Sequence, residues 1–146
     1  EEITKIDNFG AYLTAMLDID AFFMNEDRHT NNIAVIYNEK TQKYELSPFF
    51  DQGLCMFADI NQDYPIDQSL EYCLEKIEAK PFSSDFDIQL DAAEELYGIQ
   101  IGFQFTFKDI QIYLQKNSEN YPREVIRRVE QLLRRQMRKY GYLMKK

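Results

Sequence analysis

Apolar residues recur at helical spacing in the first part of the chain. Between residues 8 and 25 they fall at Phe9, Leu13, Met16, Leu17, Phe23 and Met24, which indicates an amphipathic helix. Asp7 or Asn8 is available to cap its first turn. Asp20 lies on the apolar face of this helix. Its carboxylate therefore either accepts hydrogen bonds from Arg28 and nearby loop amides, or reaches solvent at the helix edge.

A β-hairpin is the next predicted element. Residues 33–37 are rich in β-branched side chains, residues 38–42 are typical of a turn, and residues 43–47 alternate polar and apolar side chains. Pro48 ends the pairing of the second strand because it lacks a backbone N–H. The hairpin is therefore expected to return the segment that begins at Phe49 towards the loop before the first strand.

The remainder of the chain is predicted to be mostly helical. The apolar spacing indicates helices over residues 67–79, from a cap at Ser84 or Asp85 to residue 97, over residues 107–116, and from Pro122 towards the C-terminus. Residues 54–59 are interpreted as a short helical turn, and residues 99–107 as an extended connection without an evident partner strand. We therefore expect a mainly α (α+β) fold in one domain, residues 1–146.

The composition indicates a folded protein without a membrane-spanning segment. The 146 residues are 45% hydrophobic and 14% aromatic, which disfavours disorder and suffices for a core. There is no signal peptide and no apolar run near the length that spans a bilayer. Cys55 and Cys73 have no metal-ligand spacing, so we expect reduced thiols in a cytoplasmic protein.

The charge is unevenly distributed along the chain. Residues 121–146 contain 9 Lys/Arg against 2 Asp/Glu, a local charge of +7, whereas the rest contains 8 against 23, a local charge of −15. The acidic body disfavours direct nucleic-acid binding and would be repelled by an anionic membrane. The basic C-terminal segment is expected to be a solvated face, or to dock on the acidic body, on a further lobe or on an acidic partner.

Three side chains around the hairpin supply the groups that phosphoryl transfer requires. Asp27 and Asn32 lie five residues apart in the loop before the first strand, and Asp51 follows the second strand. A carboxylate must orient the attacking hydroxyl and accept its proton, while a carboxamide and another carboxylate hold magnesium on the nucleotide phosphates. Gly53 permits a backbone turn shortly after Asp51.

These residues also carry a resemblance to a known family. The run from Asp20 to Asn32, Asp-Ala-Phe-Phe-Met-Asn-Glu-Asp-Arg-His-Thr-Asn-Asn, resembles the catalytic loop of HipA-like kinases, where D-x-H-x-x-N or D-R-H-x-x-N follows a hydrophobic helix. The same string is similar, more distantly, to the phosphoinositide lipid kinases. In HipA-like kinases a short hairpin follows, and then the aspartate that corresponds to D-F-G, matched here by Asp51. The specific motifs cover residues 8–57.

The resemblance implies the helical C-terminal lobe of a kinase-like fold. Asp27 would be the catalytic base, Asn32 and Asp51 the magnesium ligands, ATP the donor, and a protein Ser or Thr hydroxyl the acceptor. Gln52 replaces the Phe of D-F-G, and no Gly-rich phosphate loop or strand lysine is present. We therefore expect a missing N-terminal lobe and no kinase activity from this chain alone. The resemblance also implies an antitoxin-like protein as a candidate partner, as is common in the HipA-like family. A binding or regulatory module and a lipid or small-molecule kinase are the alternatives.

Two neighbours of Asp27 complete the set of candidate catalytic residues. Arg28 is expected to pair with Asp20 or Asp51, or to contact a substrate phosphate. His29 is expected to brace the loop by hydrogen bonding, with the segment around Asp51 as the candidate partner. With no second His in the sequence and no nearby Cys, a zinc site at His29 is not expected.

Overall fold

The computed structural model describes residues 3–145, and in this part of the chain the fold is a mixed α/β arrangement. It contains five α-helices, two short 3₁₀ helices and one two-stranded antiparallel sheet. Their bounds, in chain order, are α1 (Phe9–Phe23), η1 (Thr30–Asn32), β1 (Val35–Asn38), β2 (Lys43–Leu46), α2 (Leu70–Lys76), α3 (Phe86–Tyr97), α4 (Phe107–Lys116), α5 (Arg123–Lys139) and η2 (Gly141–Leu143). The α+β class predicted from the sequence is confirmed at this level.

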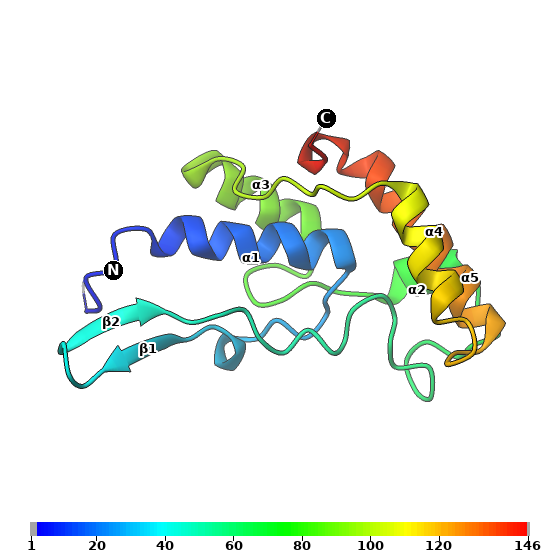
Figure 1. Cartoon of the computed structure of the whole chain (residues 1–146), viewed down its shortest axis with the longest axis horizontal. Helices are drawn as coiled ribbons and strands as arrows, with labels where there is room; N and C mark the ends of the chain where they lie inside the picture. The colour runs from blue at the N-terminus through cyan, green and yellow to red at the C-terminus, as the bar shows by residue number, and fades with distance from the viewer. Residues whose placement is uncertain (1–2, 146) are drawn as a thin grey trace.

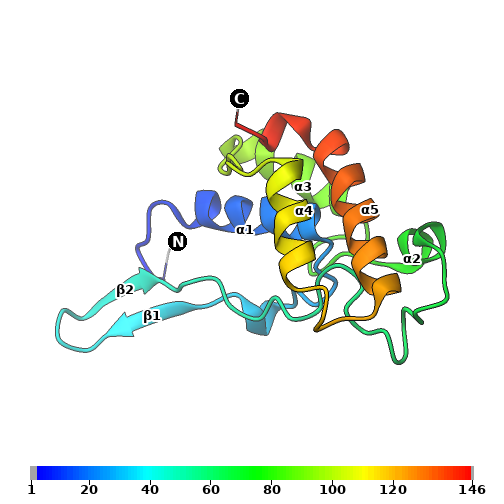
Figure 2. The ribbon, with the colours of Figure 1, turned by 45° about the vertical axis from the view of Figure 1, so that its right-hand side comes forward.

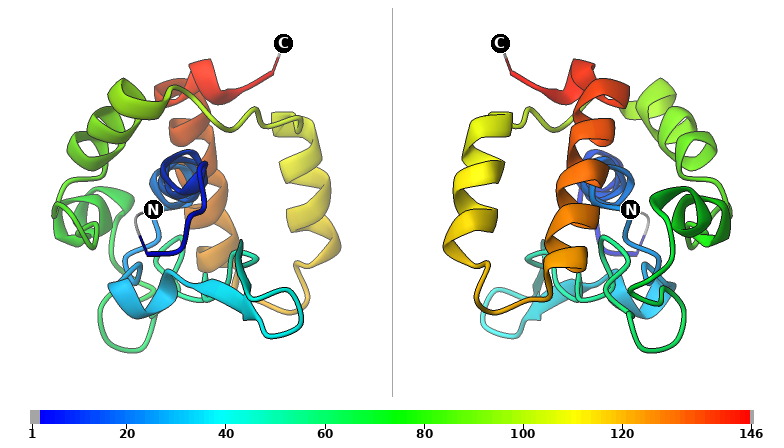
Figure 3. Two further views of the ribbon diagram at one scale, coloured as in Figure 1. Left: turned by 90° about the vertical axis from the view of Figure 1, so that its left-hand side faces the viewer. Right: turned by 90° about the vertical axis from the view of Figure 1, so that its right-hand side faces the viewer.

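Helix α1 lies at the centre of the molecule. Viewed along its axis, α3, α5 and α4 surround it on one side, and the hairpin lies on the other (Figure 3). The hairpin extends beyond the helices, beneath the N-terminal end of α1 (Figures 1 and 2). Its register pairs Val35 with Leu46 and Asn38 with Lys43, as expected for a short connection between antiparallel strands.

The core forms where the C-terminal half of α1 meets α3 and α5. Leu17 and Phe22 from α1, Leu90 from α3 and Leu132 from α5 are each at most 2% exposed. Gln136 of α5 is buried with them, and its amide donates to the carbonyl oxygens of Ala21 and Phe22 at 2.9 and 3.2 Å. These bonds satisfy acceptors that the end of α1 would otherwise leave unpaired. The C-terminal end of α1 is therefore fixed from the opposite end of the sequence.

The helix termini follow local capping chemistry. Asp85 accepts the N–H groups of the first turn of α3, Ser69 caps α2, and Thr106 forms a capping box with Asp109 at the start of α4. Asn8 precedes α1 without a side-chain cap bond. The predicted bounds of α4 are confirmed, whereas α2 is shorter at both ends than the predicted 67–79.

Two sequence predictions require correction. Residues 54–59 do not form a helical turn, because Met56 and Phe57 both have positive φ angles, 55° and 61°, which reverse the chain and bury Phe57 against Tyr64. The extended connection over residues 99–106 does have a partner, since Phe103 forms a parallel bridge with Met144 near the C-terminus. The two residues lie far apart in the sequence, so no local pattern predicts this pairing.

A buried carboxylate attaches the extended connection to α1. Asp18 is fully buried, and its Oδ2 accepts the backbone N–H groups of Gln100 and Ile101 at 3.3 and 3.1 Å. Burial, and then the hydrogen bond and negative charge of neighbouring Glu94, raise the pKa of Asp18 to about 7. Asp18 thus gives this part of the fold a pH-dependent contact.

No helix in residues 3–145 combines the length and the apolar character needed to cross a lipid bilayer.

Candidate functional site

A buried ion pair organises the loop that carries the candidate catalytic residues. Arg28 and Asp20 are both 0% exposed, with Nε to Oδ2 at 2.7 Å and Nη2 to Oδ1 at 3.0 Å. This bidentate geometry is the strongest form of an arginine–carboxylate pair. The predicted tether between the helix and the loop is confirmed, and the alternative of a solvent-facing Asp20 is wrong.

The same guanidinium joins the loop to the segment before Asp51. Arg28 Nη1 donates to the carbonyl oxygen of Asn32 at 3.1 Å and to that of Phe50 at 3.0 Å. Phe50 directly precedes Asp51 in the sequence. One buried cation therefore holds α1, the Asp27–Asn32 loop and the strand exit that carries Asp51 in a single arrangement.

Backbone hydrogen bonds hold the far side of the Asp51 segment as well. Glu26 N donates to Leu54 O at 3.3 Å, and Met56 N donates to Phe23 O at 2.9 Å. Asp51 itself is exposed and has a φ of 57°, the left-handed conformation that only Gly, Asn and Asp adopt readily. Aspartate is one of the few residues that tolerate this conformation, so residue type and backbone agree at this position.

Two buried carboxamides define the shape of the loop. Asn25 Nδ2 donates to Asp20 Oδ1 at 2.8 Å, and its Oδ1 accepts the backbone N–H of Asp27 at 3.2 Å. Asn32 Nδ2 donates to the carbonyl oxygen of Asp27 at 2.9 Å. Asp27 is thus held through its backbone on both sides, while its side chain remains free to act.

The Asp27 carboxylate lies at the surface beside two cationic or ionisable groups. Its side chain is 31% exposed, Lys80 Nζ lies 3.7 Å from Oδ1, and His29 Nε2 lies 3.9 Å from Oδ2. Within residues 3–145 the imidazole makes no side-chain hydrogen bond, so the brace predicted for His29 is wrong and Arg28 fills that role. A carboxylate without a close donor can accept a proton from an incoming hydroxyl.

A second buried contact lies under the loop. The Tyr64 hydroxyl donates a short hydrogen bond to Glu26 Oε2, and Tyr64 is only 1% exposed. Burial raises the pKa of the Glu26 carboxyl, although the bond from Tyr64 opposes this effect. Burial, followed by this acidic partner, also raises the pKa of Tyr64. Glu26, interpretable from sequence only as a loop acid, is therefore a structural anchor.

The two predicted magnesium ligands present suitable oxygen atoms. Asn32 uses its Nδ2 on Asp27, which leaves Oδ1 as an acceptor, and the Asp51 carboxylate has no hydrogen bond or ion pair within residues 3–145. Amide and carboxylate oxygens are the hard ligands that Mg²⁺ selects, with phosphates and water completing its shell. No group of three or more His, Cys, Asp or Glu side chains arranged for a metal occurs among the described residues.

The comparisons with known proteins assign no family. No family model, curated protein or solved structure matches this chain. Its chemistry is therefore inferred from its own contacts.

Two residues in this site were not found from the sequence. The role of Asn25 could have been inferred locally, because a carboxamide directly after a helix can hydrogen-bond to the backbone of the loop that follows. Lys80 lies 53 positions after Asp27, and no local pattern predicts that contact. Arg28, in turn, is fully buried by its protein partners, so it positions the loop and does not reach substrate.

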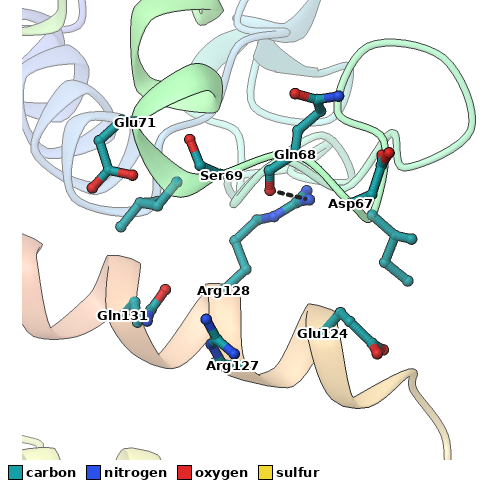
Figure 4. Close-up of a pocket in the computed structure, with 10 residues that line it drawn as sticks. Asp67, Gln68, Ser69, Glu71, Glu124, Arg127, Arg128 and Gln131 are labelled. Atoms are coloured by element: carbon teal, nitrogen blue, oxygen red, sulfur yellow. Dashed lines mark hydrogen bonds between the residues drawn. The ribbon is translucent and has the colours of Figure 1, made fainter.

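A separate hollow lies away from these residues. A cavity of about 640 Å³ separates the start of α2 from α5, and its lining includes Ser69, Glu71, Arg127 and Arg128 (Figure 4). None of its lining residues belongs to the loop of Asp27 or to the segment around Asp51.

Proposed function

We propose that this chain supplies the catalytic-loop half of a magnesium-dependent kinase, a C-terminal lobe of the HipA-like type. With its complementary lobe, it transfers the γ-phosphoryl group of ATP to the hydroxyl of a protein Ser or Thr. The observation that supports this most is the placement of Arg28. Its guanidinium binds Asp20, the carbonyl of Asn32 and the carbonyl of Phe50, and so unites the three segments that carry the candidate base and metal ligands.

Each residue has one role in this proposal. Asp27 accepts the proton of the attacking hydroxyl, and Asn32 and Asp51 hold Mg²⁺ through their side-chain oxygens. Bound magnesium would neutralise charge on the transferred phosphoryl group. Arg28 positions the loop, and His29, 42% exposed beside Asp27, lies where an acceptor peptide would approach.

Lys80 adds a cation to the proposed site. Its side chain is half exposed and its ammonium group lies beside Asp27, while Ala79 before it is buried and donates its backbone N–H to Ser84 O at 2.8 Å. The segment is therefore anchored, but the side chain is free to leave a weak 3.7 Å contact. Phosphoryl transfer is stabilised by cations at the phosphate oxygens, and Lys80 is placed to supply one.

A nucleotide titration tests the proposal on this chain. Resonances are followed by NMR as ATP is added in the presence of Mg²⁺, and Mn²⁺ then replaces Mg²⁺ to broaden signals close to the metal. We expect shifts and broadening at residues 25–32 and 50–53. Asp51→Asn should abolish both, and because Asn also tolerates a positive φ, the variant removes charge with little change in backbone strain.

The matched control is Asp91→Asn, the same substitution at an exposed position on α3. It should leave the titration unchanged. Metal-independent shifts, or shifts that survive Asp51→Asn, would refute the assigned magnesium ligands. An absence of any response at saturating MgATP would instead favour a regulatory module that retains the loop without its chemistry.

A further inference from the structure

A row of arginines on α5 has no role in the proposed kinase site. Arg127, Arg135 and Arg138 are exposed and recur along one side of the helix, at spacings of eight and three residues. At 1.5 Å of rise per residue, the row is about 16 Å long. It supplies three of the nine Lys and Arg residues of the C-terminal segment, in a chain whose net charge is −8.

These arginines lack partners within the protein. In residues 3–145, none of the three forms an ion pair or a side-chain hydrogen bond. Their neighbours differ, since Lys139 pairs with Asp87 at 2.6 Å and Arg134 lies over the Phe107 ring at 4.1 Å. The prediction that the basic segment docks on the acidic body therefore holds for Lys139 but not for this row.

The row borders a continuous groove between α2 and α5. One hollow, of about 640 Å³, is lined by Arg127 and Arg128, and a second, of about 510 Å³, by Arg135 and Arg138. Both hollows are also lined by Leu70 and Gln131, so they adjoin. A helical row of charges thus runs beside a cavity.

A buried arginine forms the floor of the larger hollow. Arg128 is 6% exposed and points from α5 to the loop before α2, where its guanidinium donates to the carbonyls of Tyr64, Pro65 and Gln68 (Figure 4). No carboxylate of residues 3–145 lies within ion-pairing distance of it. Carbonyl dipoles therefore surround this positive charge, but Asp67, Glu71 and Glu124 also line the larger hollow. The groove is most cationic at its other end, beside Arg135 and Arg138.

We propose that this groove docks an extended acidic segment of a partner protein. Arginine binds carboxylates through two parallel hydrogen bonds, and three unpaired guanidinium groups offer such sites. An extended segment of about five residues spans the row. A short peptide suits the groove better than a nucleic acid, because Asp67, Glu71 and Glu124 in the larger hollow would repel a continuous phosphate chain. A peptide can place its carboxylates at the arginines and its N–H groups or a basic residue at these three acids.

The proposal does not depend on the kinase assignment. It concerns a surface outside the Asp27 loop, and its test requires neither nucleotide nor metal. Each carboxylate–arginine contact at a surface contributes at most about 1 kcal/mol, or about fivefold in affinity. Loss of two such contacts therefore weakens binding by up to about 25-fold, and the reversed charges add repulsion, so we expect a loss of about tenfold or more.

The test is fluorescence anisotropy with a labelled peptide of about ten residues that alternates glutamate and serine. We expect saturable binding that weakens as salt is added, and at least about tenfold weaker binding by Arg135→Glu/Arg138→Glu. The matched control is Lys40→Glu/Lys43→Glu, which makes the same charge change on the exposed hairpin. It should leave the affinity within about twofold, because exposed charges beyond a Debye length are screened.

Three results would overturn the proposal. The first is no binding of the glutamate peptide, and the second is equal binding of a peptide with glutamine in place of glutamate. The third is an equal loss of affinity in the hairpin variant, which would mean that binding depends only on the net charge of the protein. Tighter binding of a single-stranded oligonucleotide of the same charge would also reject an acidic peptide as the ligand.

Discussion

Replacing Asp20 by Asn should reveal how strongly the buried ion pair holds the loop. The two side chains are nearly identical in size, so the substitution removes charge and replaces one acceptor oxygen with an N–H₂ donor. In the native arrangement both carboxylate oxygens accept from Arg28, and Oδ1 also accepts from Asn25 at 2.8 Å. The carboxamide would place a donor against a donor and leave the guanidinium without its counter-ion.

The expected cost follows from the burial of both partners. Each side chain is 0% exposed, and removal of one member of a buried pair costs about 3–5 kcal/mol because the remaining charge is left uncompensated. For a chain of this length, each kcal/mol lowers Tm by about 2–4 °C. We therefore expect a decrease of about 10 °C, together with loss of amide hydrogen-exchange protection in the loop.

The assay is urea unfolding followed by far-ultraviolet circular dichroism, with Asp91→Asn as the matched control. The control should change the free energy of unfolding by less than about 0.5 kcal/mol, as is usual for exposed sites. A double-mutant cycle with Arg28→Met then isolates the pair from the two carbonyl contacts of Arg28. Equal midpoints for Asp20→Asn and Asp91→Asn would refute the reasoning.

Three smaller perturbations test other contacts. The pKa of Asp18 is raised from 3.8 to about 7 in the folded protein. Between these two pH values the folded state binds the proton more tightly than the unfolded state, so the free energy of unfolding should fall as pH rises. Asp18→Asn should remove this pH dependence in urea titrations at several pH values. Tyr64→Phe removes the only described hydrogen bond to the Glu26 side chain, and should cost about 1–2 kcal/mol by the same assay. Lys80→Gln should leave Tm unchanged, since its ion pair is exposed, but should weaken MgATP binding in the NMR titration; unchanged binding would remove Lys80 from the site.

Local rules predicted much of this fold because several helices carry their own start and stop signals. Helix α4 begins after the Thr106 cap and was placed at its observed bounds. Helix α3 likewise starts after Asp85 and ends before Gly98. The missed features depend on distant partners: Phe57 adopts a positive φ, 61°, in a turn that packs it against Tyr64, and no propensity of Phe predicts that conformation.

In the candidate site too, some contacts could be predicted from the local sequence and others could not. The pairing of Asp20 with Arg28 could be predicted, because a carboxylate on an apolar helix face needs a partner and a cation follows eight residues later. The contact of Lys80 with Asp27 could not, because it depends on the path of α2 and the loop after it. Within residues 3–145 the side chains of Asp27 and Asp51 accept no hydrogen bond, and Asp27 has only the contacts of Lys80 and His29 at 3.7 and 3.9 Å. Only the three-dimensional arrangement reveals this.

The buried hydrogen-bond network of the loop is separate from the accessible acids that the loop carries. Here Arg28, Asn25 and Asn32 direct their donors to Asp20 and to backbone carbonyls, and the Asp27 and Asp51 carboxylates receive none of them. Asp51 is exposed and Asp27 is partly exposed, so water can solvate both carboxylates and neither needs a donor from the protein. Both stay accessible, and under the proposed function they would accept a proton and bind a metal.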